Sequence, residues 1–225
     1  MLRDQMEKQY PANQLTKFKM KNTNVTSKTR WSIDQAHSEL AFTVRHLRIT
    51  NVGGSFRTFD ASIFTRGNDF TTAEIDLWID ASSICTGDAK RDEHLRSGDF
   101  LDVEKHKQIS FTSNSVGKTD KEENHEMWGE LTMLGITKNV KLMVQFGGIE
   151  KDPRGNEKAG FTVTGKVNRS DWGLVWTTAM EAGGIMVGEE VSITCEVELT
   201  NLGQEGLTMQ LVPEVLMKLP TVKAL

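Results

Sequence analysis

The chain has 225 residues, a formal net charge of −4 and a sequence pI near 5.8. A single domain with a substantial core fits this length, since single barrels often reach it. The mild negative charge gives no support for nucleic-acid binding, which needs a strongly basic face. No segment approaches the roughly 20 apolar residues of a membrane-spanning helix, and two cysteines are too few for a disulfide framework.

Residues 1–30 are strongly basic, with seven basic against two acidic side chains, and we interpret them as a flexible N-terminal arm. An anionic surface could attract this arm, and a disordered soluble tail is the alternative. The N-terminus lacks the apolar stretch of a secretory signal. Met1 therefore favours a cytoplasmic location, with the periplasm as the alternative if a signal has been removed.

Apolar and polar residues alternate repeatedly from Trp31 onward. The pattern is clear in residues 40–45, 140–146, 161–167 and 191–199. Side chains of a strand point alternately to opposite faces, so each of these runs has one dry face and one wet face. Many such strands predict an antiparallel sheet closed around an apolar interior.

The predicted elements follow in chain order. Strands are expected over 31–48, from about 52 to 65 with a bend or bulge at Gly53-Gly54, and around Ile75, Leu77 and Ile79 after a hairpin turn at 67–69. Residues 82–103 are expected to be helical, with Ser82 and Ser83 as candidate caps. Further strands are expected around 109–111, 127–133, 140–146, 159–168 and 187–199. Eight strands in this order predict an all-β, antiparallel up-and-down barrel with a helical insertion after strand 3.

The residues after the last strand form a C-terminal extension, 202–225. Val212, Val215, Leu216 and Leu219 are spaced as one stripe of a short helix. This stripe could pack on the barrel surface, cover a barrel mouth or contact a partner subunit. The predicted organisation is thus an arm (1–30), a barrel domain (31–201) and this extension.

The alternation also predicts which apolar side chains point inward. They fit either an ordinary core or the lining of a ligand-binding pore, and Gly54, Gly129 and Gly165 are expected beside them, leaving volume or permitting a bend. The predicted lining is Leu40, Phe42, Val44, Phe56, Ile75, Leu77, Ile79, Phe111, Leu131, Val163 and Ile193.

Motifs of catalytic and metal sites are missing from the sequence. It has no H-E-x-x-H, C-x-x-C, G-x-S-x-G or phosphate-cradling glycine motif. We therefore expect no catalytic residue, no metal and no cofactor. Cys195 is interpreted as a small buried hydrophobe, whereas Cys85 could be inert, paired or reactive.

Several short motifs occur together in one order along the chain. They are Trp31-Ser32-Ile33-Asp34, His37-Ser38, His46, Arg91–Leu95, Ser97, Asp99-Phe100, Ile109–Phe111, Gly129–Thr132, Gly135–Lys138, Asn168–Gly173 and Val187–Val191. In this order, over about residues 31–201, they resemble the YceI-like family of polyisoprenoid-binding, lipocalin-like proteins.

The resemblance implies a lipocalin-like barrel whose hydrophobic pore takes an isoprenoid or similar long lipid chain. It also implies that a homodimer is possible, and that many relatives are exported to the periplasm. We accordingly expect a non-enzymatic carrier or storage protein for a long apolar lipid. The alternatives are a packed structural or stress-related barrel without ligand, and an enzyme acting on an isoprenoid-like substrate.

Polar residues near the expected barrel ends are candidates for the rim or for contact with a lipid head group. His46 could be a satisfied core group or a head-group contact. The helical-insertion cluster Arg91, Asp92 and His94 could be solvated or could tie the helix to the rim. Arg169 and Asp171 are expected to form an ion pair closing a barrel end, with a head-group contact as the second interpretation.

Overall fold

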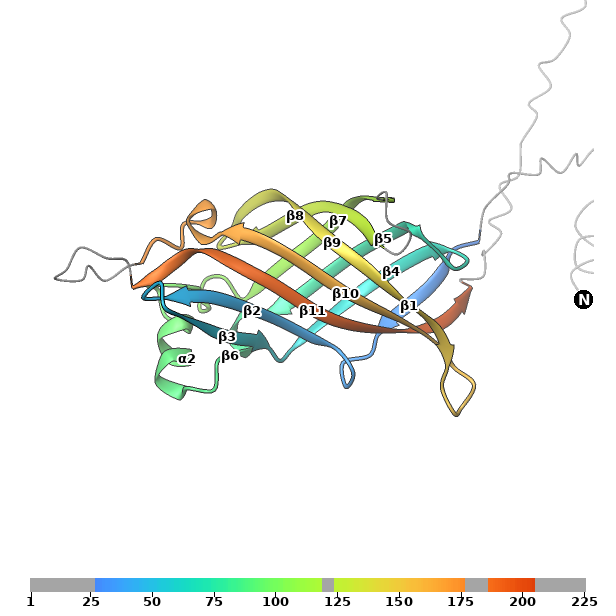
Figure 1. Cartoon of the computed structure of the whole chain (residues 1–225), viewed down its shortest axis with the longest axis horizontal. Helices are drawn as coiled ribbons and strands as arrows, with labels where there is room; N and C mark the ends of the chain where they lie inside the picture. Colours follow the sequence, from blue (N-terminus) through green and yellow to red (C-terminus); the bar gives the residue numbers. More distant parts are fainter. Residues whose placement is uncertain (1–26, 119–123, 177–185, 205–225) are drawn as a thin grey trace, which may run out of the picture.

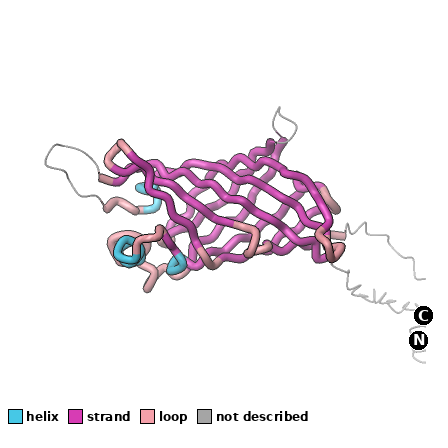
Figure 2. Tube along the Cα trace, turned by 60° about the horizontal axis from the view of Figure 1, so that its bottom comes forward, coloured by secondary structure: helices cyan, strands magenta, loops and turns pink. Residues whose placement is uncertain are grey.

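The computed structural model describes residues 27–118, 124–176 and 186–204. Most of the expected basic arm and the whole expected C-terminal helix lie outside the described residues. The described part is a β-barrel with one α-helix at one end (Figures 1 and 2). Its strands are β1 (Thr29–Ile33), β2 (Glu39–His46), β3 (Thr50–Phe56), β4 (Phe59–Arg66), β5 (Asp69–Asp80), β6 (Ile84–Cys85), β7 (Gln108–Lys118), β8 (Asn124–Met133), β9 (Ile136–Lys151), β10 (Glu157–Asn168) and β11 (Val187–Gln204).

These strands occupy eight positions around a closed antiparallel barrel. β1 and β2 lie end to end along β11, and β4 and β3 lie in turn beside β1 and β2. β5 pairs with β4, and the short β6 pairs with β3. From β5 the order is β7, β8, β9, β10 and β11, each beside its predecessor, and β11 closes the ring onto β1 and β2. The predicted eight-stranded up-and-down barrel is confirmed.

The single strand expected over 31–48 is interrupted, because residues 34–38 turn away between β1 and β2. The amide of Asp34 donates to the carbonyl of Glu198 at 2.7 Å, and the Asp34 carboxylate accepts the amide of Ala36 at 3.1 Å. The hydroxyl of Ser38 accepts the amide of Glu198 at 2.9 Å. Hydrogen bonds to β11 thus hold the break in place, and the strand direction resumes in β2.

The expected bend or bulge at Gly53-Gly54 is wrong. Phe42 faces Gly54 and Thr43 faces Gly53 in an unbroken register between β2 and β3. The hairpin turn at 67–69 is confirmed, and Gly67 adopts a φ of 57°, where glycine has no steric penalty.

The helical insertion is shorter than expected. Only Ala89–Arg96 form the helix α2. Asp88 caps its N-terminus, because the Asp88 carboxylate accepts the amides of Lys90 and Arg91. Ser82 and Ser83 belong to a separate 3-10 turn, η2 (Ala81–Ser83), and β6 follows because Ile84 and Cys85 pair with β3. Local side-chain spacing could not reveal this pairing, which joins residues about thirty positions apart.

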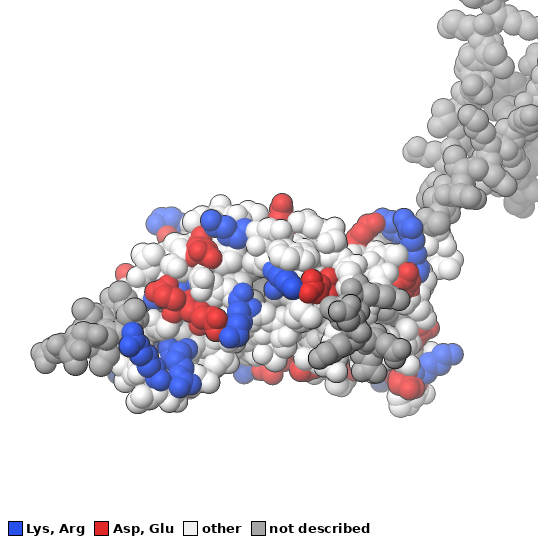
Figure 3. Space-filling model, turned by 45° about the horizontal axis from the view of Figure 1, so that its top comes forward, with Lys and Arg blue, Asp and Glu red and all other residues white. Residues whose placement is uncertain are grey.

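The alternation of side chains around the wall follows the period-two rule. In β5, Glu74, Asp76 and Trp78 are exposed, whereas Ile75 and Leu77 are half-buried and Ile79 is buried. The outer surface carries both acidic and basic side chains (Figure 3). Among the described residues there is no helix long and apolar enough to cross a membrane.

Candidate functional site: the barrel cavity

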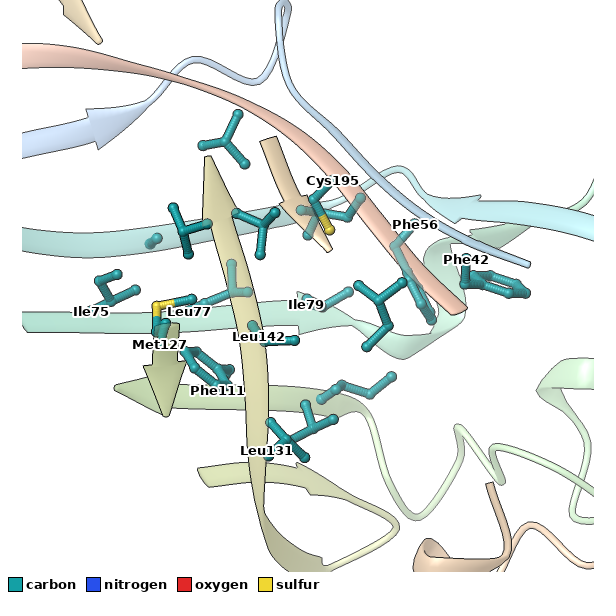
Figure 4. Close-up of a pocket in the computed structure, with 18 of the residues that line it drawn as sticks. Phe42, Phe56, Ile75, Leu77, Ile79, Phe111, Met127, Leu131, Leu142 and Cys195 are labelled. Atoms are coloured by element: carbon teal, nitrogen blue, oxygen red, sulfur yellow. The ribbon is translucent and has the colours of Figure 1, made fainter. Parts of the chain in front are cut away.

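An apolar cavity of about 560 Å³ runs through the barrel interior. This volume lies within the range of small-molecule pockets, about 300–1,000 Å³. All eleven side chains predicted to point inward line it, and Figure 4 shows labelled members from several strands directed into one shared space. Their placement around the cavity follows the alternation, while their contact with a ligand stays a prediction.

Further lining residues were missed at the sequence level. Met127, Leu142, Val144 and Cys195 line the same cavity. The signal for them was present, because each follows the same period-two pattern as a neighbour on its own strand. Volume inside a barrel depends on how side chains fold against the wall, which alternation alone does not give.

At the three glycines expected on inward faces, side chains of neighbouring strands occupy the space that a Cβ would take. A Cβ built on Gly165 would lie 2.4 Å from Cδ2 of Leu142, and one on Gly54 would lie 2.6 Å from Cζ of Phe42. A Cβ on Gly129 would lie 2.3 Å from Cζ of Phe111. Large side chains thus lie across each glycine.

Aromatic side chains gather at both ends of the cavity. At the end formed by the β4–β5 hairpin, the ring of Phe70 lies 4.9 Å from Trp31, 5.7 Å from Phe146 and 4.8 Å from Phe161. At the α2 end, Phe42 and Phe56 lie 5.8 Å apart. Among the described residues, the polar members of the lining lie at the two ends. They are Asn68, Asp69, Thr71 and His125 beside the hairpin and Arg169 at the α2 end. Sequence reasoning singled out Arg169 alone of these.

Arg169 is a structural clamp. Its side chain is 4% exposed, and it lies in η3 (Arg169–Trp172), which follows β10. Its guanidinium donates to the carbonyls of Gly188, Leu174, Trp176 and Val187 and forms a 3.1 Å ion pair with Glu189. The prediction that Arg169 pairs with Asp171 is wrong, since Glu189 forms the ion pair with Arg169 and Asp171 is exposed. The five contacts use all five N–H donors of the guanidinium. Arg169 therefore has no donor left for a lipid head group.

The predicted cluster in the insertion holds α2 against the barrel end. The Asp92 carboxylate accepts the amide of Thr86 at 2.8 Å and its hydroxyl at 2.6 Å, and these bonds lower the pKa of Asp92 below its ordinary value. Arg91 also donates to Thr86, through Nε to the hydroxyl. His94 lies 3.0 Å from the Asp99 carboxylate and packs edge-on against Phe100 and Trp176. These contacts agree with the rim interpretation.

Arg96, which the sequence did not indicate as a site residue, anchors the same helix to the barrel. Its guanidinium donates to the carbonyls of Ser82 and Ile84, both at 2.6 Å. His46, by contrast, is half-buried at the end of β2, where it faces Thr50 and Val187 in the register, and it is not part of the cavity lining.

A charged cluster fastens the break between β1 and β2. Lys158 Nζ lies 2.5 Å from Oδ2 of Asp34 and 3.0 Å from Oε1 of Glu198, and His37 Nδ1 lies 3.2 Å from Asp34. The hydrogen bond from Lys158 is the main cause that lowers the pKa of Asp34 from 3.8 to about 2. Asp34, His37 and Glu198 are close enough to share a metal ion, but the Lys158 ammonium already supplies the positive charge there. The arrangement is that of an ion-pair network.

The two cysteines differ in setting. Cys195 lines the cavity, and burial raises the pKa of its thiol from 9.0 to about 11. Its side chain is half-buried, and its place on the apolar lining agrees with the interpretation of Cys195 as a small hydrophobe. Cys85 is half-buried in β6, with its sulfur 4.0 Å from Arg57.

Comparison with known proteins adds to this geometry. The profile of the YceI-like domain matches residues 31–199. A UPF0312 protein of Staphylococcus aureus strain MSSA476 is 36% identical over 173 residues, which cover 76% of this chain and 98% of the relative.

Two solved structures are similar in fold. The YceI protein of Campylobacter jejuni has a TM-score of 0.57 at 29% identity, covering 72% of this chain and 90% of that one. A polyisoprenoid binding domain from Saccharophagus degradans, implicated in plant cell wall breakdown, has a TM-score of 0.54 at 16% identity, covering 76% and 98%. The barrel, its insertion and the profile match together place this chain in the YceI-like family.

Proposed function

We propose that this chain binds one long apolar lipid of the polyisoprenoid class inside its barrel and carries or stores it without chemical change. The observation behind the proposal is the apolar cavity of about 560 Å³, whose polar lining residues, within the described part of the chain, lie at its ends. Membership of the YceI-like family and the similar fold of the S. degradans polyisoprenoid binding domain support the choice of ligand class.

Burial of the chain supplies the binding energy. Each methylene moved from water into an apolar site contributes about 0.8 kcal/mol. Ten such groups would contribute about 8 kcal/mol before the costs of ordering and immobilising the ligand. A site of this kind selects its ligand by length and cross-section, because it offers few polar contacts along its length.

The positions of the polar residues predicted from the sequence as rim or head-group contacts favour binding over catalysis. An acid/base catalyst must reach the reacting group of the substrate within hydrogen-bond distance. Arg169 is engaged by five partners, His94 by Asp99 and two rings, and His46 lies off the lining. The alternative of a fully packed scaffold is disfavoured by the volume of the cavity.

The test is to extract the purified full-length chain with organic solvent and identify the released lipids by mass spectrometry. We expect about one apolar chain per protein. Leu77→Asp, which places an unpaired charge on the lining, should lose the lipid, whereas Thr43→Asp on the opposite wall face should retain it. Circular dichroism checks that both variants fold.

A preparation that carries no lipid, and that also fails to take up an added polyprenol, would overturn the proposal. Equal retention by the two aspartate variants would show that the ligand lies outside the barrel.

A further inference from the structure

We propose that Gly165 and Gly54 determine the ligand specificity of the cavity, because they set its width so that a methyl-branched chain fits. This inference rests on the proposed lipid binding and adds the residues that determine the preference for a branched chain. Its basis is the way in which large lining side chains lie flat across glycines of the neighbouring strand.

Gly165 and Leu142 are direct partners between β10 and β9. A Cβ on Gly165 would lie 2.4 Å from Leu142 Cδ2, a separation that real Cβ atoms essentially never show, while the next contact is Lys141 O at 3.5 Å. The conflict therefore involves the end of one side chain and not the backbone. Leu142 occupies space that any other residue at 165 would fill, so its isobutyl group lies against the wall and leaves the lumen free.

Gly54 and Phe42 repeat this arrangement near the α2 end. They face each other between β3 and β2, and a Cβ on Gly54 would lie 2.6 Å and 3.0 Å from two ring carbons of Phe42. It would also lie 2.8 Å from Cγ2 of Thr86. The ring of Phe42 thus lies over Gly54, and a side chain there would displace it.

The close approach is specific to these inward positions. Gly160 lies in β10 as well, yet a Cβ there would meet no atom within 4 Å. Gly129 also carries a ring, that of Phe111, but its Cβ would come 2.6 Å from the carbonyl of Thr112. Gly129 is therefore required by the backbone too, whereas Gly165 acts on a lining side chain alone.

Width matters because the two common kinds of long lipid differ in cross-section. An isoprenoid carries a methyl branch in every repeat unit, whereas a saturated acyl chain is unbranched. Adding a methyl at position 165 forces Leu142 toward the lumen, where it competes with the branches. A change of one methylene in an apolar pocket alters discrimination by about tenfold or more.

The experiment compares delipidated wild type with Gly165→Ala in a competition between a branched isoprenoid alcohol and a straight-chain alcohol of equal main-chain length. We expect the preference for the branched chain to fall about tenfold. Gly160→Ala is the matched control in the same strand and should leave the preference unchanged. The double variant Gly165→Ala/Leu142→Val removes the conflicting carbon and should restore the preference.

Leu142→Val alone carries no clash and should shift the preference toward the branched chain, which gives a second readout if Gly165→Ala does not fold. An unchanged preference in Gly165→Ala, a double variant that does not recover, or no shift in Leu142→Val would each overturn the inference. Wild type that binds neither alcohol would refute the proposed function itself, whereas binding of both without sensitivity at these positions would refute this inference alone.

Discussion

Asp34 is the residue whose ionisation most clearly depends on the fold. Its pKa falls from 3.8 to about 2, chiefly through the hydrogen bond from Lys158. A lowered pKa means that ionised Asp34 stabilises the folded state above about pH 4, and that this contribution disappears as the pH falls from 4 to 2. We predict that Asp34→Asn lowers the free energy of unfolding at pH 7 by about 1–2 kcal/mol, allowing for solvent screening.

Urea unfolding at pH 7, 5 and 3 measures this effect. The difference between wild type and Asp34→Asn should be constant from pH 7 to 5 and smaller at pH 3. A difference of the same size at all three values would show that the Asn variant loses packing or turn geometry instead of charge.

Cys195 reports directly on the cavity through its reactivity. Burial raises its thiol pKa to about 11, and only the thiolate reacts with alkylating reagents. In a Cys85→Ser background, the rate of alkylation at Cys195 should therefore keep rising about tenfold per pH unit beyond pH 9. Mass spectrometry of the intact protein measures the rate. A rate that stops rising near pH 9 would show that the thiol has an ordinary pKa and is exposed to water.

Single residues also show where sequence reasoning stops. The inward side chains of β5 follow from alternation, because the geometry of a strand alone fixes which face each residue takes. The partner of Arg169 does not follow from a local pattern. Asp171 is two positions away in sequence, but Arg169 forms its ion pair with Glu189 on β11. That choice depends on how the chain returns after η3, which a local pattern does not contain.

At the scale of elements, the Arg169 clamp joins η3 to the start of β11 and to Leu174 and Trp176. A lysine has three donors and cannot reach the five acceptors that the guanidinium bonds. We predict that Arg169→Lys lowers the free energy of unfolding by about 3 kcal/mol, because partly buried carbonyls lose their donors and the buried cation loses its fixed geometry. Chemical unfolding gives the value.

Glu189→Gln is the matched control for this clamp. Its side chain is about half exposed and an amide oxygen still accepts a hydrogen bond, so the cost should stay below about 1 kcal/mol. Similar stability of wild type and Arg169→Lys would mean that water replaces the lost bonds and that the clamp is dispensable.

The elements themselves were predicted with uneven success. Alternation located the long strands well, and the turn at Gly67 was identifiable from its residues. The interruption at 34–38 and the short β6 were missed, because both are defined by hydrogen bonds to distant strands. The end of α2 could not be recognised in the sequence, because the residues in the turns after Arg96 are as polar as those of the helix.

For the whole molecule, the closed barrel could be predicted because eight amphipathic strands have few other ways to bury their dry faces. The open lumen could not be derived in this way, since a barrel of this size is either filled or hollow. The difference lies in pairs such as Gly165 with Leu142, whose mutual fit appears only when the strands are in register.

The central claim is that the lumen holds a guest chain. Crystallography of the protein as purified, without added lipid, tests it most directly. We predict continuous tubular electron density running between Leu77, Phe111 and Leu142, within van der Waals contact of all three. A lumen closed by its own side chains, or containing only separate water molecules, would contradict the account.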